Sequence, residues 1–300
     1  MSKSIELAKE LEYQTLKALS ENGGELTRTQ LLDILRKTAK LDDWAKGTYE
    51  KTGYVRWESI LQFYSIDLTK AGYIVKNSKN STWAITAEGE NILKQGKEKI
   101  FETAQKLYKE WKLKSSECEV VPTTADEKQI EQYAQTPKSI LEDAQSKSYE
   151  AFEHFITTKF DPYSFQELCA ALCRGMGYYT PYVAPRGKDG GVDIIAYKDP
   201  IGASYPHIKI QVKYRQDTKA TAQEIQQLKG TLVQGNDIGM FVSLAGFTPD
   251  ARNVAKTSNI HIELIDFGRF IELWQEFYDK LPDEDKSRMQ ITPVYFVAEE

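Results

Sequence analysis

The sequence is poor in the residues that build disulfide frameworks and zinc sites. It contains three cysteines, Cys118, Cys169 and Cys173, and three histidines. So few cysteines, in an odd number, exclude a disulfide framework. The histidines have no partner spacing that would complete a tetrahedral zinc site. Cys169 and Cys173 lie four residues apart on a predicted helix, and we expect both to be buried free thiols.

Long apolar runs are also missing. No window approaches the ~18 apolar residues that indicate a membrane-spanning helix. The first residues, MSKSIELAKELEYQTLK, are charged throughout and lack the apolar centre of a secretory signal. We therefore expect a cytoplasmic protein without membrane association. With 41% hydrophobic and 28% charged residues, the 300-residue chain is typical of soluble proteins and long enough for two domains.

An overall excess of positive charge, which favours nucleic-acid binding, is missing as well. The net charge is −5, but it is unevenly spread. Basic residues outnumber acidic ones up to residue 115, and acidic residues outnumber basic ones after it. The first part of the chain could therefore supply affinity for phosphates, while the acidic part could hold a metal ion.

The residues that are most informative about function lie between Gly187 and Tyr214. A glycine-rich turn that ends at Gly191 leads into a β-branched segment, 192–197. A polar loop with two prolines then leads to a second segment, 207–214. β-branched and aromatic residues bounded by Gly and Pro are typical of paired strands. The second segment alternates apolar and polar residues, so its polar side chains share one face.

Three polar side chains converge if these two strands pair. Gln211 and Lys213 project from one face of their strand, and Asp193 starts the neighbouring strand. Carboxylate and amide oxygens are ligands of hard divalent cations such as Mg²⁺. A lysine beside such an ion can orient water and stabilise charge that develops on a phosphate. The pattern favours metal-assisted phosphodiester hydrolysis, although a Gln and a Lys alone are typical of a solvated strand face.

The residues Asp193 and Gln211-x-Lys213 are similar to the nuclease motif of the PD-(D/E)xK superfamily. They specifically resemble the Mrr-type restriction endonucleases, in which Gln replaces the middle acid. Three further blocks resemble a leading helix, a later strand and helix, and a last strand and helix of that family: DPYSFQELCAALCRGMGY, MFVSLAGFTPDARNVA and ELIDFGRFIELW. The resemblance covers residues 138–300 and implies a restriction-endonuclease-like α/β fold, a mixed sheet flanked by helices.

The resemblance also implies which residues carry the chemistry. Asp193 and Gln211 would hold Mg²⁺, helped by a carbonyl of the strand, and Lys213 would position water and stabilise charge on phosphorus. In the family the leading helix has a Glu directly after a Phe, whereas Gln166 occupies that position here and Glu167 follows it. One residue turns a helical side chain by about 100°. Either Glu167 or Gln166 would therefore assist the metal ion, and a solvated Glu167 is an equal alternative.

The first 113 residues predict a separate domain. Apolar residues at helical spacing predict helices over 5–20, 27–37 and 55–71, followed by short strands over 73–76 and 82–86. Three helices and a two-stranded unit make an α+β winged helix, a relative of the helix-turn-helix. The phrase LTKAGYIVKNSKNSTWAITAEGENIL resembles the N-terminal domain that accompanies Mrr-type catalytic domains.

A winged helix of this kind can contact DNA through its third helix and its wing. The candidate DNA contacts are Arg56, Gln62 and Lys70 of the third helix and Lys76, Lys79 and either Asn77 or Asn80 of the wing. Winged helices also serve as protein-interaction modules, so a protein partner stays the alternative.

The expected domain boundaries follow from composition. Residues 114–137 are polar and acidic and contain two prolines, so we expect a linker between the winged helix, 1–113, and the endonuclease domain, 138–300. Within the endonuclease domain we expect helices over 139–158, 163–176, 221–233, 248–256 and 267–278, and later strands over 238–244, 261–266 and 293–298.

By resemblance, the protein is a DNA endonuclease that hydrolyses phosphodiester bonds with Mg²⁺ and restricts foreign or modified, for example methylated, DNA in antiviral defence, in the manner of type IV restriction. Its partner would be double-stranded DNA. Cutting both strands would need two active sites, hence a homodimer or a higher homo-oligomer. Two alternatives stay open: a non-cleaving DNA-binding regulator or defence sensor on a retained nuclease fold, and a nuclease for RNA or branched DNA.

Overall fold

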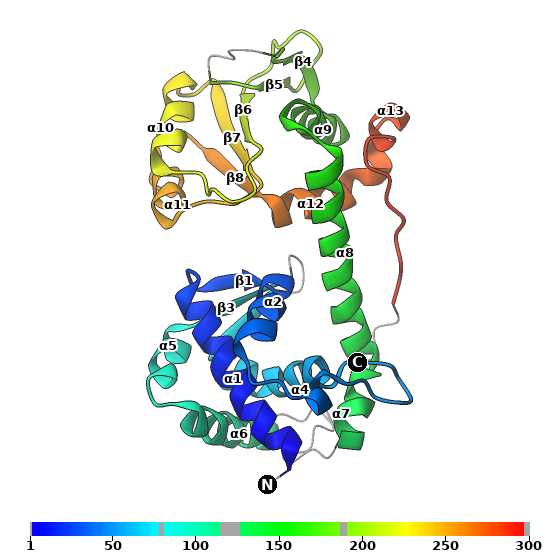
Figure 1. The fold of residues 1–300 in the computed structure, drawn as a ribbon. Helices are drawn as coiled ribbons and strands as arrows, with labels where there is room; N and C mark the ends of the chain where they lie inside the picture. The colour runs from blue at the N-terminus through cyan, green and yellow to red at the C-terminus, as the bar shows by residue number, and fades with distance from the viewer. Residues whose placement is uncertain (1, 78–80, 115–126, 187–190, 297–300) are drawn as a thin grey trace. The chain divides into compact units, whose positions relative to one another are not determined.

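A computed structural model describes residues 2–77, 81–114, 127–186 and 191–296 (Figure 1). The chain divides into two compact units. The first unit contains residues 1–150 together with 295–300, and the second contains residues 151–294. The division falls inside helix α8 (Pro137–Lys159), and not in the linker region that the composition indicates.

The first unit begins with three long helices and a small antiparallel sheet. The helices are α1 (Lys3–Glu21), α2 (Arg28–Thr38) and α4 (Arg56–Lys70), with the one-turn helix α3 (Asp43–Lys46) before α4. The sheet has the order β1-β3-β2, formed by β1 (Glu25–Thr27), β3 (Thr82–Ile85) and β2 (Ile74–Asn77). The predicted helices and wing strands are present. Strand β1 escaped prediction because three residues carry no measurable periodicity.

Local chemistry fixes where α2 begins. The Thr27 hydroxyl accepts a hydrogen bond from the backbone amide of Gln30, and the Gln30 side chain accepts one from the amide of Thr27. Such a reciprocal cap satisfies two amides that have no partner inside the helix. The apolar faces of α1, α2 and α4 then meet in one core, which includes the fully buried residues Leu16, Leu35 and Ile60.

Part of the segment expected to be a linker is helical. After α5 (Ala87–Leu93) and α6 (Lys97–Lys114), residues Glu127–Ala134 form α7. Ile130 is completely buried in the core of the first unit, and Tyr133 meets Phe63 edge-on with ring centroids 5.4 Å apart. A few apolar side chains at helical spacing are hidden in an acidic composition, but they suffice to bind a helix to an existing core. The remaining expected linker residues, 115–126, lie outside the described residues.

The second unit is built on a five-stranded mixed sheet of order β4-β5-β6-β7-β8. Its strands are β4 (Tyr179–Val183), β5 (Ile194–Tyr197), β6 (His207–Lys213), β7 (Asp237–Ser243) and β8 (Ile262–Asp266). The first three strands pair antiparallel and the last three parallel. The hairpin-like pairing predicted for β5 and β6 is therefore confirmed.

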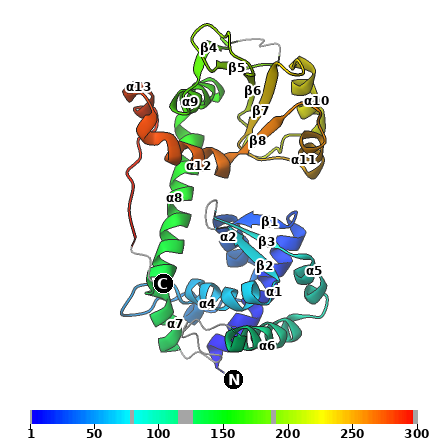
Figure 2. The same ribbon diagram turned by 180° about the vertical axis from the view of Figure 1, so that it is seen from behind.

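Helices cover both faces of this sheet, as Figure 2 shows from behind. Helices α10 (Ala222–Thr231) and α11 (Pro249–Lys256) lie on one face, and α9 (Pro162–Gly175) and α12 (Phe267–Phe277) on the other. This confirms the expected α/β fold class, a mixed sheet flanked by helices. Strand β4 was not predicted. The strand expected over 293–298 is absent from residues 293–296, and the rest of it lies outside the described residues.

Candidate active site

The pairing of β5 with β6 places the Asp193 carboxylate against the end of β6. Ile194 lies opposite Ile210 in the antiparallel register, and the backbone amide of Asp193 donates to the Ile210 carbonyl at 2.8 Å. The buried Asp193 side chain accepts a hydrogen bond from the Val212 amide at 2.6 Å. Since Val212 stands between Gln211 and Lys213, the structure brings the three predicted residues together.

Gln211 contributes a buried oxygen that has no hydrogen-bond partner in the described part of the chain. Its side chain is 4% exposed, and Oε1 receives no donor there. A buried polar atom left in this state costs on the order of 1–3 kcal/mol. A hard divalent cation held by the neighbouring carboxylate would satisfy the oxygen, since such ions take carboxylate and amide oxygens together. The residues present therefore fit Mg²⁺.

This site has little negative charge. Within the described ranges, no group of three or more His, Cys, Asp or Glu side chains is placed to hold a metal ion. A cation here would depend on one carboxylate, the neutral Gln211 oxygen and backbone or water oxygens. Mg²⁺ usually keeps several water molecules, so a sparse protein ligand set is compatible with it.

The two lysines on the polar face of β6 have different surroundings. Lys209 donates to the Thr231 carbonyl at 2.7 Å and pairs with Asp237 at 2.8 Å. Lys213, the last residue of β6, is partly exposed and forms no ion pair with any described residue. Lys209 is thus fixed to the C-terminal end of α10, while the Lys213 ammonium is available to a phosphate.

The leading helix α9 sends Gln166, and not Glu167, toward Asp193. The buried Gln166 amide donates to the Ala184 carbonyl at 2.9 Å and to the Asp193 carbonyl at 3.4 Å. The Glu167 side chain is 41% exposed and faces Arg288 at 3.8 Å. Of the two alternatives, Gln166 is therefore the residue that contacts the Asp193 segment, because one position along a helix turns a side chain by about 100°.

Sequence reasoning missed the role of Tyr214, which directly follows Lys213. Its hydroxyl donates to the carbonyls of Ile156 at 3.0 Å and Phe160 at 2.8 Å. Its ring packs on Phe165 of α9, with centroids 5.6 Å apart. Burial raises the pKa of Tyr214, which keeps the hydroxyl a donor. Tyr214 therefore fixes the end of β6 next to Lys213. The signal in the sequence that could have indicated this role is the aromatic residue at the end of a predicted strand.

The two described cysteines confirm the expectation of buried free thiols. Cys169 and Cys173 lie inside α9 and are unpaired. Burial raises the pKa of Cys173 to about 12 and that of Cys169 well above its usual range. Neither is a nucleophile at neutral pH, since the thiolate is the reactive form. Cys118 lies outside the described residues.

In the first unit, two predicted DNA contacts have intramolecular partners instead. The Arg56 guanidinium lies over the rings of Trp44 and Tyr49, at 5.8 and 5.4 Å from their centroids, and donates to the Trp44 carbonyl at 3.2 Å. The Lys70 ammonium lies 3.5 Å from the centroid of the Trp111 ring. Both positions anchor aromatic side chains, which the local sequence around α4 could not reveal.

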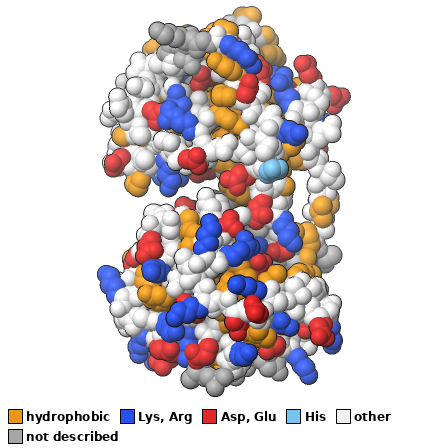
Figure 3. Space-filling model, viewed as in Figure 1, with side chains coloured by type: hydrophobic (Ala, Val, Ile, Leu, Met, Phe, Trp, Pro, Cys, Tyr) orange, Lys and Arg blue, Asp and Glu red, His pale blue; other side chains and the backbone are white. Residues whose placement is uncertain are grey.

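Of the other predicted contacts, Lys76 and Gln62 lie under α8, and Asn77 is exposed at the end of β2. Lys76 donates to the Ser65 hydroxyl at 2.7 Å, lies over the Trp83 ring and faces Glu142 at 3.8 Å. Burial lowers its pKa to about 8. Gln62 donates to the Ser139 carbonyl at 3.3 Å. Lys79 and Asn80 lie outside the described residues. On the face of the first unit seen in Figure 3, basic and acidic side chains are interspersed.

Among the described residues, every helix is too short or too polar to cross a bilayer.

Comparison with known proteins gives two family matches. Residues 157–274 match the family model described as restriction endonuclease, the Mrr catalytic domain. Residues 9–95 match that of the Mrr N-terminal domain. No curated protein matches the chain.

Two solved structures are similar to parts of the chain. The MspJI restriction endonuclease in complex with a 27-mer oligonucleotide shares 16% identity over 50% of this chain and 36% of its own, with a TM-score of 0.37. A repair endonuclease from Pyrococcus abyssi shares 17% identity over 36% of this chain and 47% of its own, with a TM-score of 0.27. The chain thus spans about a third and about half of these two proteins.

Proposed function

We propose a specific activity for this chain, which belongs to the Mrr-type restriction endonucleases and joins their N-terminal domain to their catalytic domain: Mg²⁺-dependent hydrolysis of phosphodiester bonds in double-stranded DNA. The observation that carries the proposal is the buried Gln211 oxygen without a hydrogen-bond partner among the described residues, beside the Asp193 carboxylate. A cation is the ligand that satisfies both groups, and a phosphodiester is the substrate for which Lys213 is suitably placed.

Each residue has a separate part in this proposal. Asp193 and Gln211 hold Mg²⁺, together with a carbonyl of β6. The ion, when bound, supplies a Lewis acid and a water of lowered pKa. Lys213 orients the attacking water and stabilises negative charge on the phosphate. Gln166 keeps the two backbone segments that flank the site at a fixed distance through its hydrogen bonds to the Ala184 and Asp193 carbonyls.

The finer parts of the function rest on the family. Foreign or modified, for example methylated, DNA is the proposed substrate, and restriction of such DNA in antiviral defence is the proposed role, within the cytoplasm. The N-terminal domain, proposed as a winged helix, would engage the duplex. Cleavage of both strands would require two copies of the site, so we propose a homodimer or a higher homo-oligomer.

The test is cleavage of matched methylated and unmethylated supercoiled plasmids, with Mg²⁺ or with EDTA. We expect nicked or linear product in Mg²⁺ and none in EDTA. Faster cleavage of the methylated plasmid would support restriction of modified DNA, and equal rates would limit the proposal to a general DNA endonuclease. If neither plasmid is cut in Mg²⁺, the protein is instead a non-cleaving DNA-binding regulator or sensor.

A further inference from the structure

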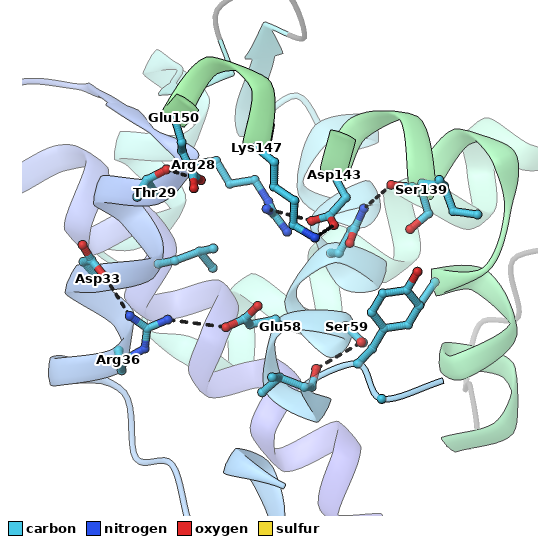
Figure 4. Close-up of a pocket in the computed structure, with 17 residues that line it drawn as sticks. Arg28, Thr29, Asp33, Arg36, Glu58, Ser59, Ser139, Asp143, Lys147 and Glu150 are labelled. Carbon is cyan, nitrogen blue, oxygen red and sulfur yellow. Dashed lines mark hydrogen bonds and ion pairs between the residues drawn. The ribbon is translucent and has the colours of Figure 1, made fainter. Parts of the chain in front are cut away.

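The first half of α8 covers one face of the first unit. This face is formed by the start of α2, by α4 and by strands β2 and β3. Figure 4 shows α8 side chains pointing toward α2. The contacts pair Arg28 with Asp143 at 3.1 Å, Lys76 with Glu142 at 3.8 Å, Gln62 with the Ser139 carbonyl at 3.3 Å, Ser81 with Ser146 at 2.6 Å, and Thr29 with Glu150.

These contacts are polar, unlike those that hold the neighbouring helix α7. Ile130 of α7 is buried in the apolar core, whereas the buried side chains of the first half of α8 are Ser139 and Ser146. The carboxylates of the two ion pairs, Glu142 and Asp143, keep 33% and 26% of their side-chain surface exposed, so salt and competing anions can reach them. The first half of α8 is therefore held by interactions that a competing polyanion can replace.

A solvent-accessible pocket also lies beside the contacts that α8 makes. A cavity of about 440 Å³ lies between α2, α4 and α8, lined by charged side chains from all three helices (Figure 4). A helix that is held by polar contacts beside such a pocket can be displaced from the surface more readily than a helix packed in the core.

The covered face has the chemistry of a phosphate-binding surface. Arg28 stands at the N-terminal end of α2, where backbone amides favour anions. Arg28 and Lys76 are largely buried beneath α8, and each faces one carboxylate. Gln62 projects from the third helix of the winged helix, the element that enters DNA in this class of fold. Carboxylate and phosphate oxygens both accept charge-assisted hydrogen bonds from such cations.

We propose that this face is a binding surface for the phosphates of duplex DNA and that residues 137–150 of α8 occupy it as an intramolecular substitute for DNA. The inference rests on the proposed function, because it takes DNA as the partner. DNA and α8 compete for Arg28 and Lys76. Binding of DNA is therefore weakened by the fraction of molecules in which the face is covered.

The first test removes the carboxylates that face the two cations. Glu142→Gln combined with Asp143→Asn releases α8, and DNA affinity should rise on the order of tenfold, with a steeper salt dependence as more phosphates are contacted. The measurement is fluorescence anisotropy of a labelled duplex with the full chain in EDTA at several salt concentrations. The matched control, Glu88→Gln with Glu102→Gln, makes the same charge change at exposed positions of α5 and α6.

The second test holds α8 on this face with a disulfide, which does not change the charge of the protein. The Ser81 and Ser146 hydroxyls are 2.6 Å apart, so cysteines at both positions are close enough for a disulfide. In a Cys118→Ser background, oxidised Ser81→Cys/Ser146→Cys should bind DNA on the order of tenfold more weakly than the reduced form. Reduction should restore the affinity of the background protein.

The outcomes separate this inference from the proposed nuclease activity, because EDTA abolishes cleavage in every arm. Equal affinities of the oxidised and reduced protein would overturn the inference, as would equal effects of the two double neutralisations. Tighter binding by the released protein and weaker binding by the locked one would support it even if no variant ever cleaves DNA. If the protein cleaves plasmid but its DNA affinity does not change when the disulfide forms, the proposal that α8 occupies the DNA-binding surface is refuted. The nuclease proposal is then unaffected.

Discussion

The two units differ in the surroundings of their buried ionisable side chains. In the first unit, burial raises the pKa of Glu12 well above its usual range and that of Asp67 to about 7, and the cations Arg28 and Lys76 each face a carboxylate. Charge is thus neutralised there by protonation or by pairing within the chain. In the second unit, the buried Gln211 oxygen has no donor among the described residues. Partnerless buried oxygens occur in both units, since both carboxyl oxygens of Glu12 also receive no hydrogen bond from the described residues. What distinguishes Gln211 is its position across the strand pair from the buried Asp193 carboxylate, where we propose a cation.

The largest effect on this comparison should come from Asp193→Asn. The substitution removes the single fixed negative charge that the described residues offer a cation at the site, so we expect plasmid cleavage in Mg²⁺ to be abolished while DNA binding stays close to wild type. Asp217→Asn is the matched control, since Asp217 is exposed and lies four residues beyond Lys213. Wild-type cleavage by purified Asp193→Asn would refute the metal assignment.

Lys213→Ala should have the next largest effect. Lys209, the neighbouring cation on the same strand face, is fixed to Thr231 and Asp237 and cannot replace Lys213. Loss of one preorganised charge near a reacting phosphate commonly lowers the rate about 10²- to 10³-fold. Single-turnover plasmid cleavage measures this loss, with Lys219→Ala as the exposed control. If the rate falls less than about tenfold while the protein is folded, Lys213 is not the charge that stabilises the transition state.

Gln211→Leu tests whether the oxygen without a donor is a metal ligand. Metal that binds only the folded protein stabilises it, so the wild-type Tm should rise with Mg²⁺ concentration. The leucine variant should lose this rise and, in EDTA, should be as stable as wild type or more stable, because no buried oxygen is left without a partner. Gln62→Leu, whose amide is bonded to the Ser139 carbonyl, should keep the Mg²⁺-dependent rise. A Tm response to Mg²⁺ that survives Gln211→Leu would contradict the proposal.

A last effect, on stability and not on cleavage, is a pH dependence in the first unit. The folded pKa of Asp67 is about 7, against an ordinary value of 3.8. Between these values the folded protein keeps a proton that the unfolded chain releases, so stability falls as pH rises through this window. Each unit of pKa difference corresponds to about 1.4 kcal/mol. Asp67→Asn, which resembles the protonated form, should flatten the decline, and Glu102→Gln should not.

Urea unfolding followed by tryptophan fluorescence at pH 5 and pH 8 provides the measurement, because Trp44, Trp57, Trp83 and Trp111 lie in the first unit and Trp274 is the fifth tryptophan. An equal loss of stability between the two pH values in wild type and in Asp67→Asn would show that Asp67 is ionised in the folded protein.

Sequence patterns were sufficient where the signal is local or carried by a motif. The alternation along β6 and the glycine-bounded segment before it placed Gln211, Lys213 and Asp193 on neighbouring strands, and the structure brings them together. The same reasoning left Gln166 and Glu167 as alternatives, because the choice depends on which helical position faces the sheet. It also missed α7, whose few apolar residues have meaning only beside the core that Ile130 enters.

The sequence by itself determined the fold class, the family and the three central residues of the candidate site, because periodicity and motif order are properties of short segments. The tertiary structure alone decided that Gln166 approaches Asp193, that Arg56 and Lys70 anchor aromatic rings, and that Lys76 lies beneath α8. The physical reason is that burial and charge pairing depend on contacts between residues far apart in the chain, such as Lys76 and Glu142. A local sequence pattern does not show which distant residues will be in contact.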